Sequence, residues 1–86
     1  MSNITNMDEM REILDILRMA NPAVAFEGRT DLFSSGDLDS MNIIMIASEI
    51  NDRFDVELRA IDITPENFDS PDGILALIKR LKKEEA

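Results

Sequence analysis

The sequence has 86 residues, which is enough for one domain with a single hydrophobic core and too few for two. Its 18 acidic and 9 basic residues give a formal net charge of −9 at pH 7. Such an acidic surface disfavours binding to nucleic acid and favours basic protein partners. Cysteine and histidine are absent, which excludes disulfides, thiolate metal sites and imidazole-based catalysis.

The hydropathy pattern argues against membrane insertion. No apolar run reaches the roughly 20 residues needed to cross a bilayer. The first twelve residues lack the basic and apolar segments of a signal peptide. We therefore expect a cytoplasmic protein, with residues 1–86 forming one domain whose core spans about residues 7–81.

The first predicted helix precedes Asn21-Pro22, where a proline ends the pattern. Asn6 is placed to cap this helix, and Glu9 stands three residues later, as a capping box requires. The apolar residues on its predicted buried face are Met7, Met10, Ile13, Leu14 and Leu17.

Residues 21–39 form a long predicted connection. Connections of this length are uncommon in a small domain and are often functional. Four apolar residues within it predict that it packs over the core: Val24, Phe26, Leu32 and Phe33.

A second helix is predicted over residues 40–53, with Asp39 as its N-cap and Ser40 as its exposed first residue. Its predicted buried face consists of Ile43, Ile46, Ala47, Ile50 and Phe54. This places the Ser40 hydroxyl at the positive end of the helix dipole.

Two Ser/Thr-Pro pairs start helices in the last third of the chain. Thr64-Pro65 begins a short helix that ends at Phe68, and Ser70-Pro71 begins the last helix. The last helix has Ile74, Leu75, Ile78 and Leu81 on one face. Because alternating strand patterns are nearly missing, we predict an all-α fold with three main helices and one short helix around one core.

The acidic residues between Asp31 and Asp39 do not form a calcium loop. Counted from Asp31, loop position 3, which must supply an oxygen ligand, is Phe33, and a loop counted from Asp37 lacks the required glycine. Two acids beside a helix start, such as Asp37 and Asp39, are typical of a cap and a dipole partner. We therefore predict neither catalytic nor metal-binding residues.

A group of side chains lies off the predicted buried face of the second helix. It contains Met41, Ile44 and Met45, with Glu49 and Asp52 further along. One interpretation is that the core extends further around this helix. The other is an apolar patch that docks partner proteins, with methionine supplying adaptable packing.

Ser40 has no neighbouring base in the sequence that could activate it as a nucleophile. Its expected position suits a residue that is itself modified. The free N–H groups and the dipole of a helix start would accommodate a phosphodiester.

With these motifs the chain resembles the acyl carrier protein family, which includes the carrier domains of polyketide and non-ribosomal peptide synthases. The resemblance covers about Met7 to Leu81. It rests on three segments: Gly-x-Leu-Asp-Ser-Met at 36–41, residues 50–58, and Ile-Thr-Pro-Glu-Asn-Phe at 63–68. It implies a four-helix bundle with a long first loop and a short third helix.

The resemblance also implies a cofactor and partners. A separate phosphopantetheinyl transferase would attach 4′-phosphopantetheine to Ser40, using coenzyme A and magnesium, with Asp39 capping the helix and orienting the site. The thiol of this arm would hold acyl or aminoacyl groups as thioesters for loading and processing enzymes. We expect a non-catalytic, monomeric carrier.

The sequence departs from carriers of fatty acid biosynthesis, which have several acids soon after the serine. Here Asn42 and Met45 occupy such positions, and the first acid after Ser40 is Glu49. This favours a specialised acyl, lipid, polyketide, peptide or D-alanylation pathway, and the Asp-Ser-Met form resembles D-alanyl carriers. The alternative is an unmodified interaction module that binds partners through its Met41/Met45 face.

Overall fold

The fold is all-helical over residues 6–85, which the computed structural model describes, with side chains described for residues 8–83. No strand occurs within this range, and the predicted fold class is confirmed. The elements in chain order are α1 (Asn6–Ala20), α2 (Ser40–Phe54), the 3-10 helix η1 (Ala60–Asp62), α3 (Pro65–Phe68) and α4 (Pro71–Glu85).

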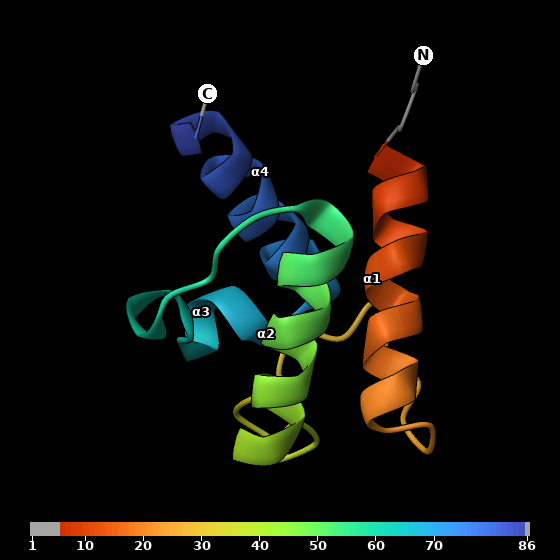
Figure 1. Cartoon of the computed structure of the whole chain (residues 1–86). Helices are drawn as coiled ribbons and strands as arrows, with labels where there is room; N and C mark the ends of the chain where they lie inside the picture. Colours follow the sequence, from red (N-terminus) through yellow and green to blue (C-terminus); the bar gives the residue numbers. More distant parts are fainter. Residues whose placement is uncertain (1–5, 86) are drawn as a thin grey trace.

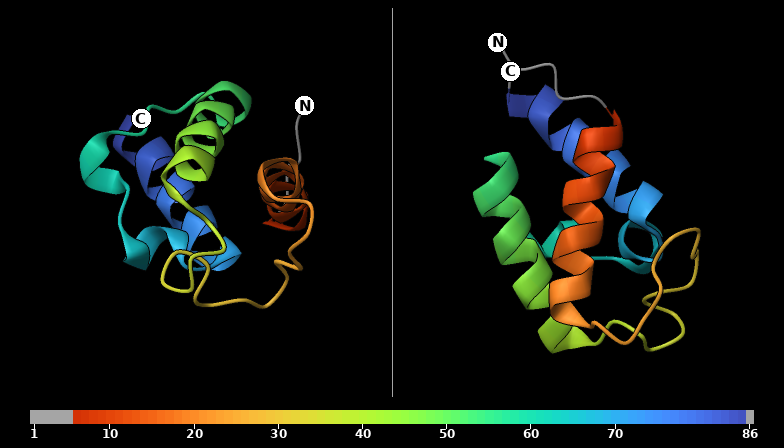
Figure 2. Two further views of the ribbon diagram at one scale, coloured as in Figure 1. Left: turned by 90° about the horizontal axis from the view of Figure 1, so that it is seen from below. Right: turned by 90° about the vertical axis from the view of Figure 1, so that its right-hand side faces the viewer.

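Helices α1 and α2 lie side by side and run in opposite directions (Figure 1). Helix α1 also packs against α4, and the short α3 packs against α4. The connection 21–39 crosses the end of the bundle at which α2 begins, as both views of Figure 2 show. The start of α2 is thereby placed between the end of α1 and a long covering loop.

The core differs from the predicted helix faces at several positions. Ile16 and Leu77 are fully buried although neither belonged to a predicted face. Met10, Leu14 and Leu75, which were expected in the core, are only partly buried. The reason is that α1 contacts both α2 and α4, so its buried surface is centred on Ile13, Ile16 and Leu17.

Two expectations for α1 fall outside the described side chains. Helix α1 includes Asn6 as its first residue, one position earlier than predicted, and the side chains of Asn6 and Met7 are not described. The proposed cap at Asn6 and the burial of Met7 therefore stay predictions.

The connection 21–39 packs on the core as predicted. Phe26 and Leu32 are buried, and Val24 and Phe33 are partly buried against the same cluster. Leu38 is buried as well. The loop is thus an ordered part of the domain, and its last residues lead directly into α2.

The two Ser/Thr-Pro pairs cap their helices as predicted. Thr64 Oγ1 accepts a hydrogen bond from the Asn67 N–H at 3.3 Å, and Ser70 Oγ accepts one from the Gly73 N–H at 2.9 Å. The 3-10 helix η1 was not predicted, because three residues are too short to show a helical period. Among the described residues, no helix is long and apolar enough to cross a membrane.

Asp69, which follows α3, fastens the long loop to the junction of α3 and α4. Its Oδ1 accepts hydrogen bonds from the N–H groups of Phe33 and Ser34, both at 2.9 Å, and the Ser34 hydroxyl donates to Oδ2 at 2.9 Å. The bonds from the Ser34 backbone, the Ser34 hydroxyl and the Phe33 backbone lower the pKa of Asp69 below its ordinary value of 3.8.

This lowered pKa predicts a defined pH dependence of stability. A carboxylate whose pKa is depressed by folding stabilises the protein above its unfolded pKa, and this contribution is lost as the pH falls through the folded pKa. We therefore expect Asp69→Asn to lower the unfolding temperature by several degrees at pH 7, and this difference to shrink below about pH 3.8. Thermal unfolding followed by circular dichroism at pH 7 and pH 2 measures it. Asp52→Asn, at an exposed aspartate on α2, should cause no comparable change, and an equal loss at both pH values would contradict the assignment.

Candidate functional site

Ser40 is the first residue of α2, and its side chain is exposed. Asp39 caps the helix as predicted, with an extended backbone at φ −95° and ψ −178°. Its Oδ1 accepts the Asn42 N–H at 2.9 Å, and Asn42 Oδ1 accepts the Asp39 N–H at 3.2 Å. This reciprocal capping box fixes the turn that presents the Ser40 hydroxyl.

Asn42 also connects the start of α2 to the end of α1. Its Nδ2 donates to the Ala20 carbonyl at 3.1 Å, while its Oδ1 serves the capping box. A carboxylate at this position could accept from Asp39 but could not donate to Ala20. Sequence reasoning noted only that Asn42 replaces an acid, because the position of Ala20 relative to α2 is set by the tertiary fold.

The surroundings of Ser40 suit attachment of a phosphodiester. The Asp39 carboxylate is engaged by the cap, and the first N–H groups of α2 and the helix dipole favour a bound negative charge. Phe33, Ile43, Ile44 and Ile63 form with Ser40 a mostly apolar hollow of about 190 Å³. The site therefore offers an exposed hydroxyl, a favourable dipole and a small apolar surface.

The predicted partner face divides into exposed and half-buried residues. Met41 is 79% exposed and Ile44 is 67% exposed, whereas Met45 is half-buried. Glu49 is half-buried and accepts a hydrogen bond from Arg53 Nε at 3.1 Å, and Asp52 is exposed. Met45 is thus partly covered by the core, whereas Met41 and Ile44 form an exposed apolar surface; docking of partners on it stays a prediction.

Ile61 in η1 was missed by sequence reasoning although it is 75% exposed. It lies two residues before Ile63, which lines the hollow beside Ser40. A large apolar side chain outside any periodic segment was the only signal in the sequence that could have indicated it.

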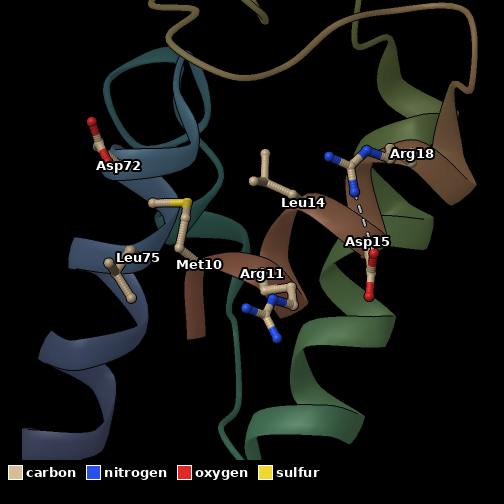
Figure 3. Close-up of a pocket in the computed structure, with 7 residues that line it drawn as sticks. All are labelled: Met10, Arg11, Leu14, Asp15, Arg18, Asp72 and Leu75. Carbon is tan, nitrogen blue, oxygen red and sulfur yellow. Dashed lines mark hydrogen bonds and ion pairs between the residues drawn. The ribbon is translucent and has the colours of Figure 1, made fainter. Parts of the chain in front are cut away.

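A larger groove of about 770 Å³ lies between α1 and α4 (Figure 3). Met10 and Leu14 from α1 and Leu75 from α4 form its apolar part. Arg11, Asp15, Arg18 and Asp72 surround it, so its charges balance and select no particular ion. None of these residues lines the hollow at Ser40. Among the described residues, no group of three or more acidic side chains could hold a metal ion.

Similarity to known proteins identifies the family to which the chain belongs. Residues 8–79 match the family described as "Phosphopantetheine attachment site". The chain belongs to this phosphopantetheine-binding carrier family. The resemblance to acyl carrier proteins found in the sequence is thereby confirmed, and the family's cofactor is 4′-phosphopantetheine held covalently on a serine.

Several curated relatives are similar along nearly their whole length. The D-alanyl carrier protein of Lactococcus lactis subsp. lactis is 31% identical over 81 residues, covering 94% of this chain and 85% of the relative. Those of Lactobacillus acidophilus and Lactobacillus delbrueckii subsp. bulgaricus are 25% and 27% identical, covering 91% and 92% of this chain and 100% of each relative. No solved structure matched the chain.

Proposed function

We propose that Ser40 carries the phosphopantetheine arm and that the protein presents acyl or aminoacyl thioesters on it to partner enzymes. The observation that carries this proposal is the exposed Ser40 hydroxyl at the capped start of α2, inside the segment that matches the family. When bound, the arm supplies a terminal thiol, which this cysteine-free chain lacks.

Arm attachment needs a separate enzyme. The Ser40 oxygen forms a new bond to the phosphorus of coenzyme A that bears the pantetheine. The bond from this phosphorus to the adenosine bisphosphate portion breaks. We assign the hydroxyl proton to a base of the transferase, since Asp39 Oδ1 already accepts the Asn42 N–H in the helix cap.

The proposed cargo is a small aminoacyl group. The relatives described above are named D-alanyl carrier proteins, which supports D-alanine as the first candidate. The hollow beside Ser40, at about 190 Å³, equals roughly six times the ~30 Å³ that a water occupies in the liquid. An open hollow of this size could not enclose a long fatty acyl chain, which is consistent with a small cargo.

The test uses the full-length apo protein with coenzyme A, magnesium and a broad-specificity phosphopantetheinyl transferase. We expect the intact mass to increase by one phosphopantetheine per chain. Failure of any addition would contradict the proposal. Such a failure, together with a stable complex through Met41 and Ile44, would establish the alternative function as an unmodified interaction module.

We further propose that partners dock on the surface formed by Met41, Ile44 and Met45, with Glu49 and Asp52 at its far end. The exposure of Met41 and Ile44 next to Ser40 supports this proposal. No charged residue lies between Ser40 and Ser48, so the apolar contact would contribute more than electrostatic attraction. The transferase and the loading and processing enzymes are the expected partners. A cytoplasmic location and a monomeric state stay predictions.

Two substitutions separate docking from core packing. Met41→Glu should lower kcat/KM for arm transfer about tenfold and leave the urea unfolding midpoint unchanged, because Met41 is 79% exposed. Met45→Glu should lower the unfolding midpoint, because Met45 is half-buried. Initial rates with the transferase and urea titrations measure both effects. The control is Ala76→Glu, which adds the same charge at an exposed position of α4; a similar slowing in that variant would contradict docking at Met41.

A further inference from the structure

Arg29, in the loop between α1 and α2, holds the segment that leads into Ser40. Its Nη2 donates to Asp37 Oδ2 at 2.6 Å and to Ser35 Oγ at 3.4 Å, and its Nε donates to Asp31 Oδ1 at 3.0 Å. Asp37 lies two residues before the cap Asp39. The guanidinium therefore joins the middle of the loop to its last turn.

The backbone of this last turn is held as well. The Asp37 carbonyl accepts a hydrogen bond from Asn21 Nδ2 at 3.1 Å, and the Leu38 N–H donates to the Leu32 carbonyl at 3.1 Å. Gly36 has a φ of 88°, in the left-handed region that favours glycine, and this turns the chain toward Asp37. The Arg29–Asp37 pair adds an ion pair to these contacts and joins the turn to the middle of the loop.

We propose that the Arg29–Asp37 ion pair positions Ser40 for arm transfer by keeping the start of α2 in the conformation that the transferase recognises. Both partners are partly shielded, with side chains 32% and 35% exposed, and one guanidinium serves three acceptors. Without the pair, residues 30–38 gain conformations, so the segment that leads into the Asp39 cap is held by fewer contacts. The inference rests on the proposed role of Ser40.

The kinetic test compares two substitutions that break the pair but change the charge in opposite directions. Arg29→Ala makes the chain more acidic and Asp37→Asn makes it less acidic. Both should raise the KM of the full-length apo protein for a broad-specificity phosphopantetheinyl transferase about fivefold, with kcat unchanged, because only molecules with a formed site bind. The double variant should show no larger change than either single variant, because both remove the same contact.

Two further variants serve as controls. Arg18→Ala removes an arginine of α1 that pairs with Glu27 in the same loop, and it changes the charge by the same amount as Arg29→Ala. It should leave KM unchanged. Arg29→Lys keeps the charge but cannot reach all three acceptors, so its KM should lie between those of the wild type and Arg29→Ala.

Amide hydrogen exchange tests the same proposal without any transferase. In Arg29→Ala, exchange at Leu38 and Asn42 should become about fivefold faster, while Ile78 in the core of α4 stays as slow as in the wild type. Changes in KM of opposite sign for Arg29→Ala and Asp37→Asn, an equal effect of Arg18→Ala, or unchanged exchange at Leu38 would overturn the proposal. A wild type that is never modified would refute the role of Ser40 instead, and the exchange measurement would still decide whether Arg29 orders the site.

Discussion

Replacing Ser40 with alanine is expected to abolish addition of phosphopantetheine completely. The hydroxyl oxygen forms the bond to phosphorus, and alanine offers no atom that could replace it. The fold should persist, because the Asp39 carboxylate and Asn42 continue to cap α2, and exposed substitutions of this kind change stability by about 0.5 kcal/mol or less. Intact mass after incubation with coenzyme A and the transferase measures the loss.

Ser48 provides the matched control for this experiment. It is an exposed serine on the same helix, two turns beyond Ser40, and it has no neighbouring helix start. Ser48→Ala should be modified as fully as the wild type. Arm addition that survives Ser40→Ala, or that is lost in Ser48→Ala, would show that the attachment point has been misassigned.

The second large effect is expected at Phe68, which is fully buried in the four-residue helix α3. Phe68→Ala removes a large aromatic side chain from the core and leaves a cavity, which costs about 3–5 kcal/mol. A domain of this size has a total stability of roughly 4–13 kcal/mol, so the variant should lose a large part of its stability and unfold at a much lower urea concentration than the wild type. Urea unfolding followed by circular dichroism measures the change.

Ile61→Ala is the comparison for Phe68→Ala. Ile61 is a large apolar residue in the neighbouring η1 but is 75% exposed, so its truncation should change the free energy of unfolding by about 0.5 kcal/mol or less. A loss of less than about 1 kcal/mol in the free energy of unfolding of Phe68→Ala would contradict the packing of Phe68 in the core.

Local sequence patterns were sufficient for the helices and for the site's own turn. The cap at Asp39 and the start of α2 at Ser40 depend on residues within three positions of each other, and the same is true of the Thr64 and Ser70 caps. Such contacts follow from the backbone geometry of a helix start, so they can be predicted without the tertiary fold. The apolar repeats likewise predicted α2 and α4 within a residue or a few residues of their ends.

The errors arose where several helices share one surface. The helical repeat places Met10 and Leu14 on the same predicted face as Ile13 and Leu17. In the structure Ile13 and Leu17 are buried, whereas Met10 and Leu14 line the groove between α1 and α4. Leu77 is buried although the repeat favoured Leu75. The apolar repeat shows which side of a helix faces the core, but it does not show where the edges of the buried surface lie. The packing of the other helices determines which residues at those edges are covered.

Local patterns in the sequence predict an acidic, all-helical carrier with Ser40 at a capped helix start as the candidate attachment point. What surrounds that serine depends on contacts between distant segments. Asn42 reaches the Ala20 carbonyl 22 residues away, and Asp69 holds the Phe33 N–H 36 residues away. The tertiary structure also separated the exposed Met41 from the half-buried Met45. These features join segments distant in the chain, and no local propensity or spacing records which segments meet.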